Sequence, residues 1–188
     1  MFKETKGGKM PEKTKNRELP KISEDNDKFE FTGESKTIVD ENGKEHTLYR
    51  IRAKKDMELL RIKEKYTILD RIRDWFTPTE YYVRMEDAPW QTIYPVYRIH
   101  VHKGDLGGFI EKEENLDYKS SAWVFDDSMV YDDALVSEDA QVYDGAQVCG
   151  DSWVHGDHVW VHGKIVIANC EWTFGNIIEN CIRKAKRH

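Results

Sequence analysis

Valine returns at every sixth position along residues 122–157, and small and acidic residues return with it. Each six-residue unit begins with Ala or Ser, has Val third, and ends with two residues drawn from Asp, Glu and Gly. After one extra residue, His158, the pattern continues more loosely to residue 176. The regular units are AWVFDD, SMVYDD, ALVSED, AQVYDG, AQVCGD and SWVHGD, and the looser ones are VWVHGK, IVIANC and EWTFGN.

This period predicts a chain that coils through triangular turns. Each flat face would place one bulky and one small side chain in a narrow interior, and the Asp/Gly pairs would occupy the corners, where turn residues are tolerated. Three units make one coil, so successive coils would stack like paired strands, about 4.8 Å apart. An ordinary antiparallel strand, with a period of two, does not restore Val at every sixth residue. We therefore predict a short parallel β-helix over residues 119–176, whose core forms only by stacking.

The chain before the repeat predicts a small α+β cap domain over residues 28–118. Residues 28–53 alternate apolar and polar side chains around Asn42-Gly43, a pair that favours a tight turn, so we predict an antiparallel hairpin. Residues 57–76 carry apolar residues at helical spacing among charged ones. This spacing predicts a helix there. Such a domain can cover one open end of the coil.

Both ends of the chain are basic, and the repeat is acidic. Residues 1–17 hold six Lys/Arg against two Glu, whereas residues 120–163 hold nine Asp/Glu and no Lys/Arg. Residues 1–27 contain few apolar groups and are expected to form a flexible basic arm. In residues 177–188, isoleucines at helical spacing precede a basic tail, which predicts a C-terminal helix that covers the other end of the coil.

The composition predicts a soluble protein of the cytoplasm. The net charge is −6, 34% of the residues are charged, and no apolar run approaches the roughly 20 residues that span a bilayer. The N-terminal MFKETKGGKMPEKTK lacks an apolar core and is not expected to act as a secretory signal. The three cysteines form no CxxC pair, and their odd number argues against a disulfide framework, which favours a reducing compartment.

The repeat resembles the hexapeptide-repeat superfamily, in which an aliphatic residue is followed four places later by a small one. The pairs that fit are Val124/Ser128, Val130/Ala134, Val136/Ala140, Val142/Ala146 and Val148/Ser152. Together with LYRIRA and KGDLGGFIEKEENL, units such as VYDGAQV resemble a group of phage and prophage proteins with a small N-terminal domain that caps a short hexapeptide β-helix. The resemblance implies a left-handed type of β-helix and a phage origin. In that group the RIRA and KGDLGG motifs usually lie close together, so the resemblance also implies that the predicted helix belongs to an insertion of about residues 54–102. KGDLGG lacks the Gly-Lys-Ser/Thr ending of a phosphate loop and is expected to be a turn that docks the cap.

Three histidines near the end of the repeat are the candidates for chemistry: His155, His158 and His162. Hexapeptide acyltransferases use a histidine as general base, and one carbonic anhydrase class of the superfamily binds zinc through histidines at a trimer interface; neutral imidazole suits both tasks. By their place in the repeat, His155 and His162 follow Val154 and Val161 and face outward. Because no carboxylate or further ligand is evident beside them, we predict surface histidines, no bound metal and no cofactor.

The acidic corners and the outward tryptophans form the predicted partner-binding surface. The corner carboxylates either solvate the β-helix or present a negative surface to a basic partner. An exposed Trp at the second position is costly unless it is covered or used in binding, and Leu135, Trp153 and Trp172 are predicted to stack in a column. Trimer packing would also explain that column. The predicted contact residues are Asp126, Asp132, Asp133, Asp144, Trp123, Trp153 and Trp172.

These observations predict a non-enzymatic, phage-type binding protein whose partner is a host protein or nucleoprotein complex. Inhibition of a host nucleic-acid-handling or defence complex is the concrete version of this hypothesis. Two alternatives stay open: an acyltransferase trimer with His155 or His162 as the general base, and a virion or scaffold component whose function is oligomerisation. The basic termini offer a further contact with nucleic acid.

Overall fold

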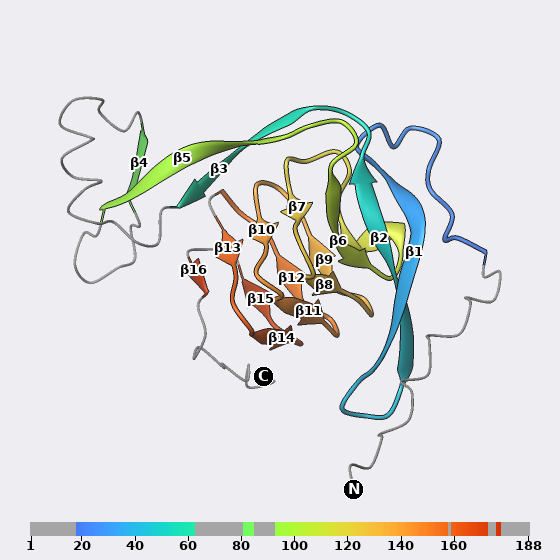
Figure 1. The fold of residues 1–188 in the computed structure, drawn as a ribbon. Coiled ribbons are helices and arrows are strands. Elements are labelled where there is room, and N and C mark those ends of the chain that lie inside the picture. The colour runs from blue at the N-terminus through green and yellow to red at the C-terminus, as the bar shows by residue number, and fades with distance from the viewer. Residues whose placement is uncertain (1–17, 63–80, 85–92, 158, 173–175, 178–188) are drawn as a thin grey trace, which may run out of the picture.

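A parallel β-solenoid of about four turns forms the centre of the protein in the computed structural model (Figure 1). The predicted β-helix is therefore confirmed. The fold is mainly β, and the one helix among the described residues is the short 3-10 helix η1, Glu113–Asn115. The structure describes residues 18–62, 81–84, 93–157, 159–172 and 176–177.

Each turn places one short strand on each of three faces. The hairpin face holds β6 (Leu106–Ile110), β8 (Met129–Val130), β11 (Gln147–Cys149) and β14 (Val166–Ala168). The arm face is named for the strand Met57–Ile62 that lies over it, and not for the basic N-terminal arm. It holds β7 (Trp123–Val124), β10 (Gln141–Val142), β13 (Trp160–Val161) and β16 (Asn176–Ile177). The Trp153 face holds β9 (Leu135–Val136), β12 (Trp153–Val154) and β15 (Glu171–Trp172).

The valines of the repeat point inward and form the core of the solenoid. Val124, Val142 and Val161 pair in consecutive turns of the arm face, and all three are fully buried. Full burial of one Val side chain stabilises the fold by about 1.5–3 kcal/mol. Because a strand of two residues buries almost nothing alone, this stabilisation arises only when turns stack.

The corners between strands contain a residue with a left-handed backbone, and the Asp144-Gly145 corner contains two. Asp126, Asp132, Glu138 and Asp144 have φ angles of 53° to 58°. Such angles strain most side chains, whereas glycine adopts them freely and Asp and Asn are enriched there. The later corners accordingly use Gly150, Gly156, Gly163 and Asn169. The turn geometry thus favours Asp, Asn or Gly at the fifth position of a unit, whether or not that residue also contacts a partner.

The cap is joined to the solenoid through one continuous sheet. Strands β1 (Phe29–Val39) and β2 (Glu45–Ala53) form the predicted antiparallel hairpin, β2 pairs with β6, and β6 pairs in parallel with β8. The two glycines of β6 allow this junction. A Cβ atom on Gly107 would lie 2.6 Å from Ile51 Cγ1, and one on Gly108 would lie 2.5 Å from Val124 Cγ1.

The insertion forms a β-arm where the sequence predicted a helix. Strand β3 (Met57–Ile62) pairs antiparallel with β5 (Ile93–Val101), which also pairs with β4 (Tyr81–Arg84). The apolar residues of this segment fit a period of two as well as a helical period: Met57 and Leu59 pack against the core, and Glu58 between them is exposed. The helix prediction is therefore wrong over residues 57–62, and residues 63–76 lie outside the described part of the chain.

The two ends of the described chain also differ from the predictions. Residues 18–27 are ordered by polar contacts: Ser23 and Asn26 donate hydrogen bonds to the Glu113 carboxylate, over 2.6–3.0 Å. The rest of the predicted flexible arm, residues 1–17, lies outside the described residues. Ile177, predicted to be helical, lies in β16, and the remainder of the predicted C-terminal helix is not among the described residues.

Lys28 ties the cap to the first coil from a fully buried position. Its Nζ donates hydrogen bonds to the backbone carbonyls of Asp117 and Ser120, at 2.8 Å each. Burial lowers the pKa of this amine from 10.5 to about 7, although the nearby Asp117 carboxylate favours its charged form.

Replacing Gly108 should weaken the junction between cap and solenoid. The Gly108→Ala side chain would press against Val124 and the Ser128 carbonyl oxygen, and such overpacking costs about 1–3 kcal/mol of the free energy of unfolding. Urea denaturation measures this loss. Leu106→Ala is the control, because Leu106 lies in the same strand but is 52% exposed and should change stability by no more than about 0.5 kcal/mol. Equal stability of the two variants would contradict the steric argument.

The buried Lys28 should give the protein a pH-dependent stability. Between pH 7 and 10.5 the unfolded chain holds a proton on this amine that the folded chain does not, given the pKa of about 7 in the folded protein. The free energy of unfolding should therefore rise with pH in this window, by at most about 1.4 kcal/mol per unit. Lys28→Met lacks this contribution, so the stability of the native protein relative to the variant should increase from pH 7 to 10. A difference that stays constant over this range would exclude a depressed pKa.

Candidate functional site

The β-arm covers the arm face of the solenoid, so this face does not present its tryptophans. In Figure 1 strands β3 and β5 cross beside β7, β10 and β13. The side chains of Gln141 and Trp160 donate hydrogen bonds to the Leu60 carbonyl oxygen of β3, at 2.6 and 3.1 Å. Trp123, predicted to contact a partner, points outward as expected but is fully buried. The β-arm of the same chain therefore covers the surface around Trp123 that was predicted to contact a partner.

Arg61 of the arm reinforces this cover through two aromatic rings. Its guanidinium carbon lies 4.2 Å from the ring centroids of both Phe125 and Tyr143. His162 stacks on Tyr143, with ring centroids 4.8 Å apart and an angle of 4° between the planes. His162 is therefore buried, although its position in the repeat predicted an exposed surface histidine.

The hairpin face carries a groove of mixed charge. The cavity has a volume of about 650 Å³ and is bordered by the acidic Asp126, Asp127 and Asp144 and by the basic Lys36 and Lys164. Arg50 pairs with Asp127 at 2.9 Å. Asp126 and Asp144, both predicted contacts, are exposed, and neither forms an ion pair with another described residue.

Two further predicted contacts, Asp132 and Asp133, bind the cap of the same chain. Lys44 Nζ lies 2.5 Å from a carboxylate oxygen of Asp132, and Lys112 Nζ lies 2.6 Å from one of Asp133. The Lys112 hydrogen bond lowers the pKa of the Asp133 carboxyl. Part of the acidic edge thus complements the basic side chains of the cap, which a reading of the repeat alone could not reveal.

The Trp153 face presents an exposed aromatic side chain at its centre. Leu135, Trp153 and Glu171 occupy equivalent outward positions in consecutive turns. Trp153 is 43% exposed, and its indole N–H donates a 3.1 Å hydrogen bond to Ser137 Oγ. The polar atom of the indole is satisfied within the protein, so the ring can offer apolar surface without a desolvation cost for its nitrogen.

Trp172 does not join this column, contrary to the prediction. Its Cα partner is Val154, and Glu171 takes the place beside Trp153. The reason is a shorter corner. In the regular units, consecutive inward residues such as Val148 and Val154 are six positions apart, whereas Ile167 and Trp172 are only five positions apart. The missing residue turns the Trp172 side chain toward the core, against which it is partly buried.

His155 is held beside Trp153 by two carboxylates. The imidazole and indole rings stack with centroids 3.8 Å apart. His155 Nε2 lies 3.1 Å from Glu171 Oε1, and Nδ1 lies 3.7 Å from Glu138 Oε1. The structure thus places a carboxylate beside each ring nitrogen, where the sequence showed none, and the ring packs against Trp153. His158 lies outside the described residues.

An acidic groove runs from Trp153 toward the first coil. The cavity has a volume of about 470 Å³. None of its described lining residues is Lys or Arg, and its lining residues are Ser23, Glu113, Glu114, Leu116, Asp117, Tyr118, Leu135, Ser137, Glu138 and Trp153. Glu113 is engaged with Ser23 and Asn26, so Glu114, Asp117 and Glu138 supply most of the negative charge open to a ligand.

Comparison with known proteins gives no relative for this chain: no protein-family model, no curated protein and no solved structure matches it. The resemblances to the hexapeptide superfamily and to phage proteins therefore stay predictions from the sequence. Within the described residues there is no helix of the length and apolar character needed to cross a membrane.

Proposed function

We propose that the protein is a non-enzymatic binding protein that docks its Trp153 face on a basic segment of a macromolecular partner. The observation that carries this proposal is the exposure of Trp153 at 43% beside a groove lined by acidic residues. Large aromatic side chains that are exposed, fixed and central to a patch are frequent anchors of protein interfaces.

The charge of the groove selects the chemistry of the partner. Glu114, Asp117 and Glu138 would repel the phosphates of a nucleic acid and attract Lys or Arg side chains. Arginine fits best, because its planar guanidinium can stack on the Trp153 ring and form paired hydrogen bonds with a carboxylate. A protein whose basic surface normally holds nucleic acid has this character, which agrees with the hypothesis of a host nucleic-acid-handling target.

The anchor is organised before binding. The Ser137 hydrogen bond, the His155 stack and the short rigid strands hold Trp153 in place, so little side-chain freedom is lost when a partner covers it.

Cys149 and Cys170 are free thiols, and burial raises the pKa of both. We propose that the protein acts in the reducing cytoplasm, where such thiols persist.

Trp153→Ala should remove the anchor without disturbing the core. A nine-residue arginine peptide at moderate salt serves as the probe, with peptides of lysine and of glutamate for comparison. We expect the arginine peptide to bind best, and the variant to bind it at least tenfold more weakly by calorimetry. Val166→Ala is the matched control, because Val166 is 50% exposed on the hairpin face and should leave the affinity unchanged.

Two results would contradict the proposal. Equal affinity of the native protein and Trp153→Ala for the arginine peptide would remove this face from the binding surface. Light scattering after size exclusion gives the second test. If the native protein is a trimer and Trp153→Ala a monomer, the face is an interface between copies of the chain rather than a partner site.

A further inference from the structure

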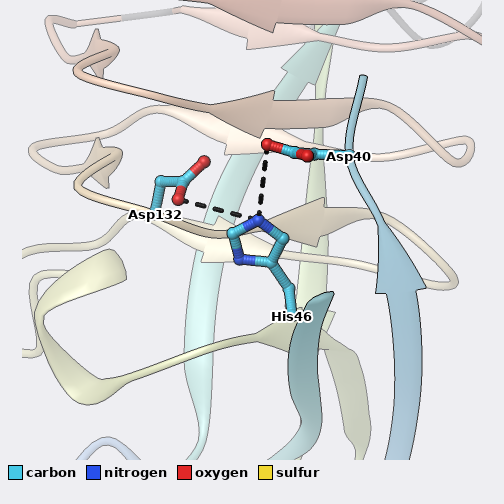
Figure 2. Close-up of side chains that lie close together, drawn as sticks. All are labelled: Asp40, His46 and Asp132. Carbon is cyan, nitrogen blue, oxygen red and sulfur yellow. Dashed lines mark ion pairs between the residues drawn. The ribbon is translucent and has the colours of Figure 1, made fainter. Parts of the chain in front are cut away.

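A buried histidine and two carboxylates meet where the hairpin turn touches the solenoid (Figure 2). Asp40 directly follows β1, His46 lies in β2, and Asp132 occupies the corner after β8. His46 Nε2 lies 3.8 Å from Asp40 Oδ2 and 3.7 Å from Asp132 Oδ1. The three atoms all lie within 4.8 Å of one another, so the two sides of the hairpin turn and a corner distant in the sequence direct ligand atoms at one point.

The other nitrogen of His46 is already engaged. Nδ1 lies 3.1 and 3.2 Å from the two carboxylate oxygens of Glu111, and Glu111 is fixed in turn by the backbone N–H of Asp132, at 2.7 Å. The Glu111 carboxylate can only accept, so in the neutral form of the imidazole the proton lies on Nδ1 and the lone pair on Nε2. A carboxylate behind a histidine is the usual support of a metal-binding imidazole.

The lone pair on Nε2 has no hydrogen-bond partner among the described residues. His46 is fully buried, and Tyr131 packs on its ring, with centroids 4.9 Å apart. The neighbours of Nε2 are two carboxylate oxygens at 3.7 and 3.8 Å, beyond the 2.7–3.2 Å typical of an N–H···O bond. Two carboxylates facing Nε2 favour a positive charge at this point, either a proton on Nε2 or a metal ion held between the three groups.

We propose that His46, Asp40 and Asp132 bind a divalent transition-metal ion, with Zn²⁺ as the best fit. One imidazole and two carboxylates are ligands that Zn²⁺ accepts, whereas Ca²⁺ and Mg²⁺ favour oxygen alone. Bonds to Zn²⁺ of about 2.0–2.2 Å at tetrahedral angles place ligand atoms about 3.4 Å apart. The two distances from His46 Nε2, 3.7 and 3.8 Å, would need to shrink by only a few tenths of an ångström. The two carboxylate oxygens, which lie within 4.8 Å of each other, would have to move together, and a water molecule would complete the set.

The hairpin turn holds Asp40 ready for this role. Asp40 Oδ1 accepts hydrogen bonds from the backbone N–H groups of Asn42 and Lys44, at 2.9 and 2.7 Å. Oδ2 is left facing His46, with one further contact to the Asn42 amide at 3.3 Å. The turn therefore orients one carboxylate oxygen toward the metal position at no cost in side-chain freedom.

Lys44 is the competitor for the same position. Its Nζ lies 2.5 Å from Asp132 Oδ1, the oxygen that faces His46, and its side chain is 61% exposed. An exposed lysine can swing into solvent at little cost, so a divalent ion would displace it. The bound ion would clip the β1–β2 hairpin to the solenoid and raise the thermal stability of the protein. This inference is independent of the function proposed for the Trp153 face.

Zinc titration of the protein, freed of metal by dialysis against a chelator, tests the site. Competition with a chromogenic chelator should give one Zn²⁺ per chain, and Co²⁺ should give a visible absorption band of the bound ion. We expect the affinity to fall at least tenfold in His46→Gln and in Asp132→Asn. Lys44→Gln should bind several-fold more tightly, because it removes the competing ammonium group. His155→Gln is the matched control, since His155 also lies between two carboxylates, and should leave the affinity unchanged.

The proposal fails if no stoichiometric Zn²⁺ binds, or if His46→Gln binds it as well as the native protein does. If circular dichroism shows that His46→Gln is unfolded, the Zn²⁺ affinities of Asp40→Asn and Lys44→Gln test the proposal instead. Asp40→Asn keeps the oxygen that accepts the two backbone hydrogen bonds of the turn. It replaces the oxygen at the metal position by an uncharged NH₂ group and loses the 3.3 Å contact with the Asn42 amide. Unchanged affinity in both of these variants would overturn the proposal, and weaker binding in the first with tighter binding in the second would support it.

Discussion

The narrow triangular interior of the solenoid is the constraint on which the rest of the structure depends. Each face has room for one inward Val and one small residue, as Val136 and Ala134 show, and both are almost completely buried. The strands are so short that no turn is stable alone, and stacking supplies the core. The interior therefore dictates the spacing of the repeat, the left-handed corners and the need to close the first coil. Strand β6 meets that last need, because its glycines let the cap approach Val124.

The solenoid has three outward faces, and they differ in how far the rest of the chain covers them. The β-arm covers the face of Trp123 and Trp160, which are fully buried. The cap extends the sheet of the hairpin face through β2 and β6. On the remaining face Trp153 is 43% exposed. Trp153 differs from Trp123 and Trp160, which the chain itself covers, and this contrast is the reason that Trp153 is the proposed anchor.

The repeat predicted the solenoid because a single local rule, Val at every sixth residue, dictates both register and burial. The β-arm could not be predicted in this way, since Leu59 and Ile62 satisfy a helical period and the pairing of β3 with β5 decides otherwise. The inward turn of Trp172 depends on one residue missing from a corner. The His46 cluster left only a weak signal, an Asp and a His across a hairpin turn, because Asp132 comes from a distant part of the chain. Contacts between distant segments are what the sequence pattern does not encode.

The acidic corners show how one sequence feature serves two physical roles. The corner geometry demands residues such as Asp, so carboxylates accumulate along the edges of the coil whether or not a partner exists. Near the cap these charges face Lys44, Arg50 and Lys112, and each of these cations pairs with a corner Asp. Around the Trp153 groove the described lining contains no cation. The corner carboxylates are therefore paired with Lys and Arg near the cap, whereas no Lys or Arg is among the described lining residues of the groove. This imbalance is the physical reason to test a basic ligand there.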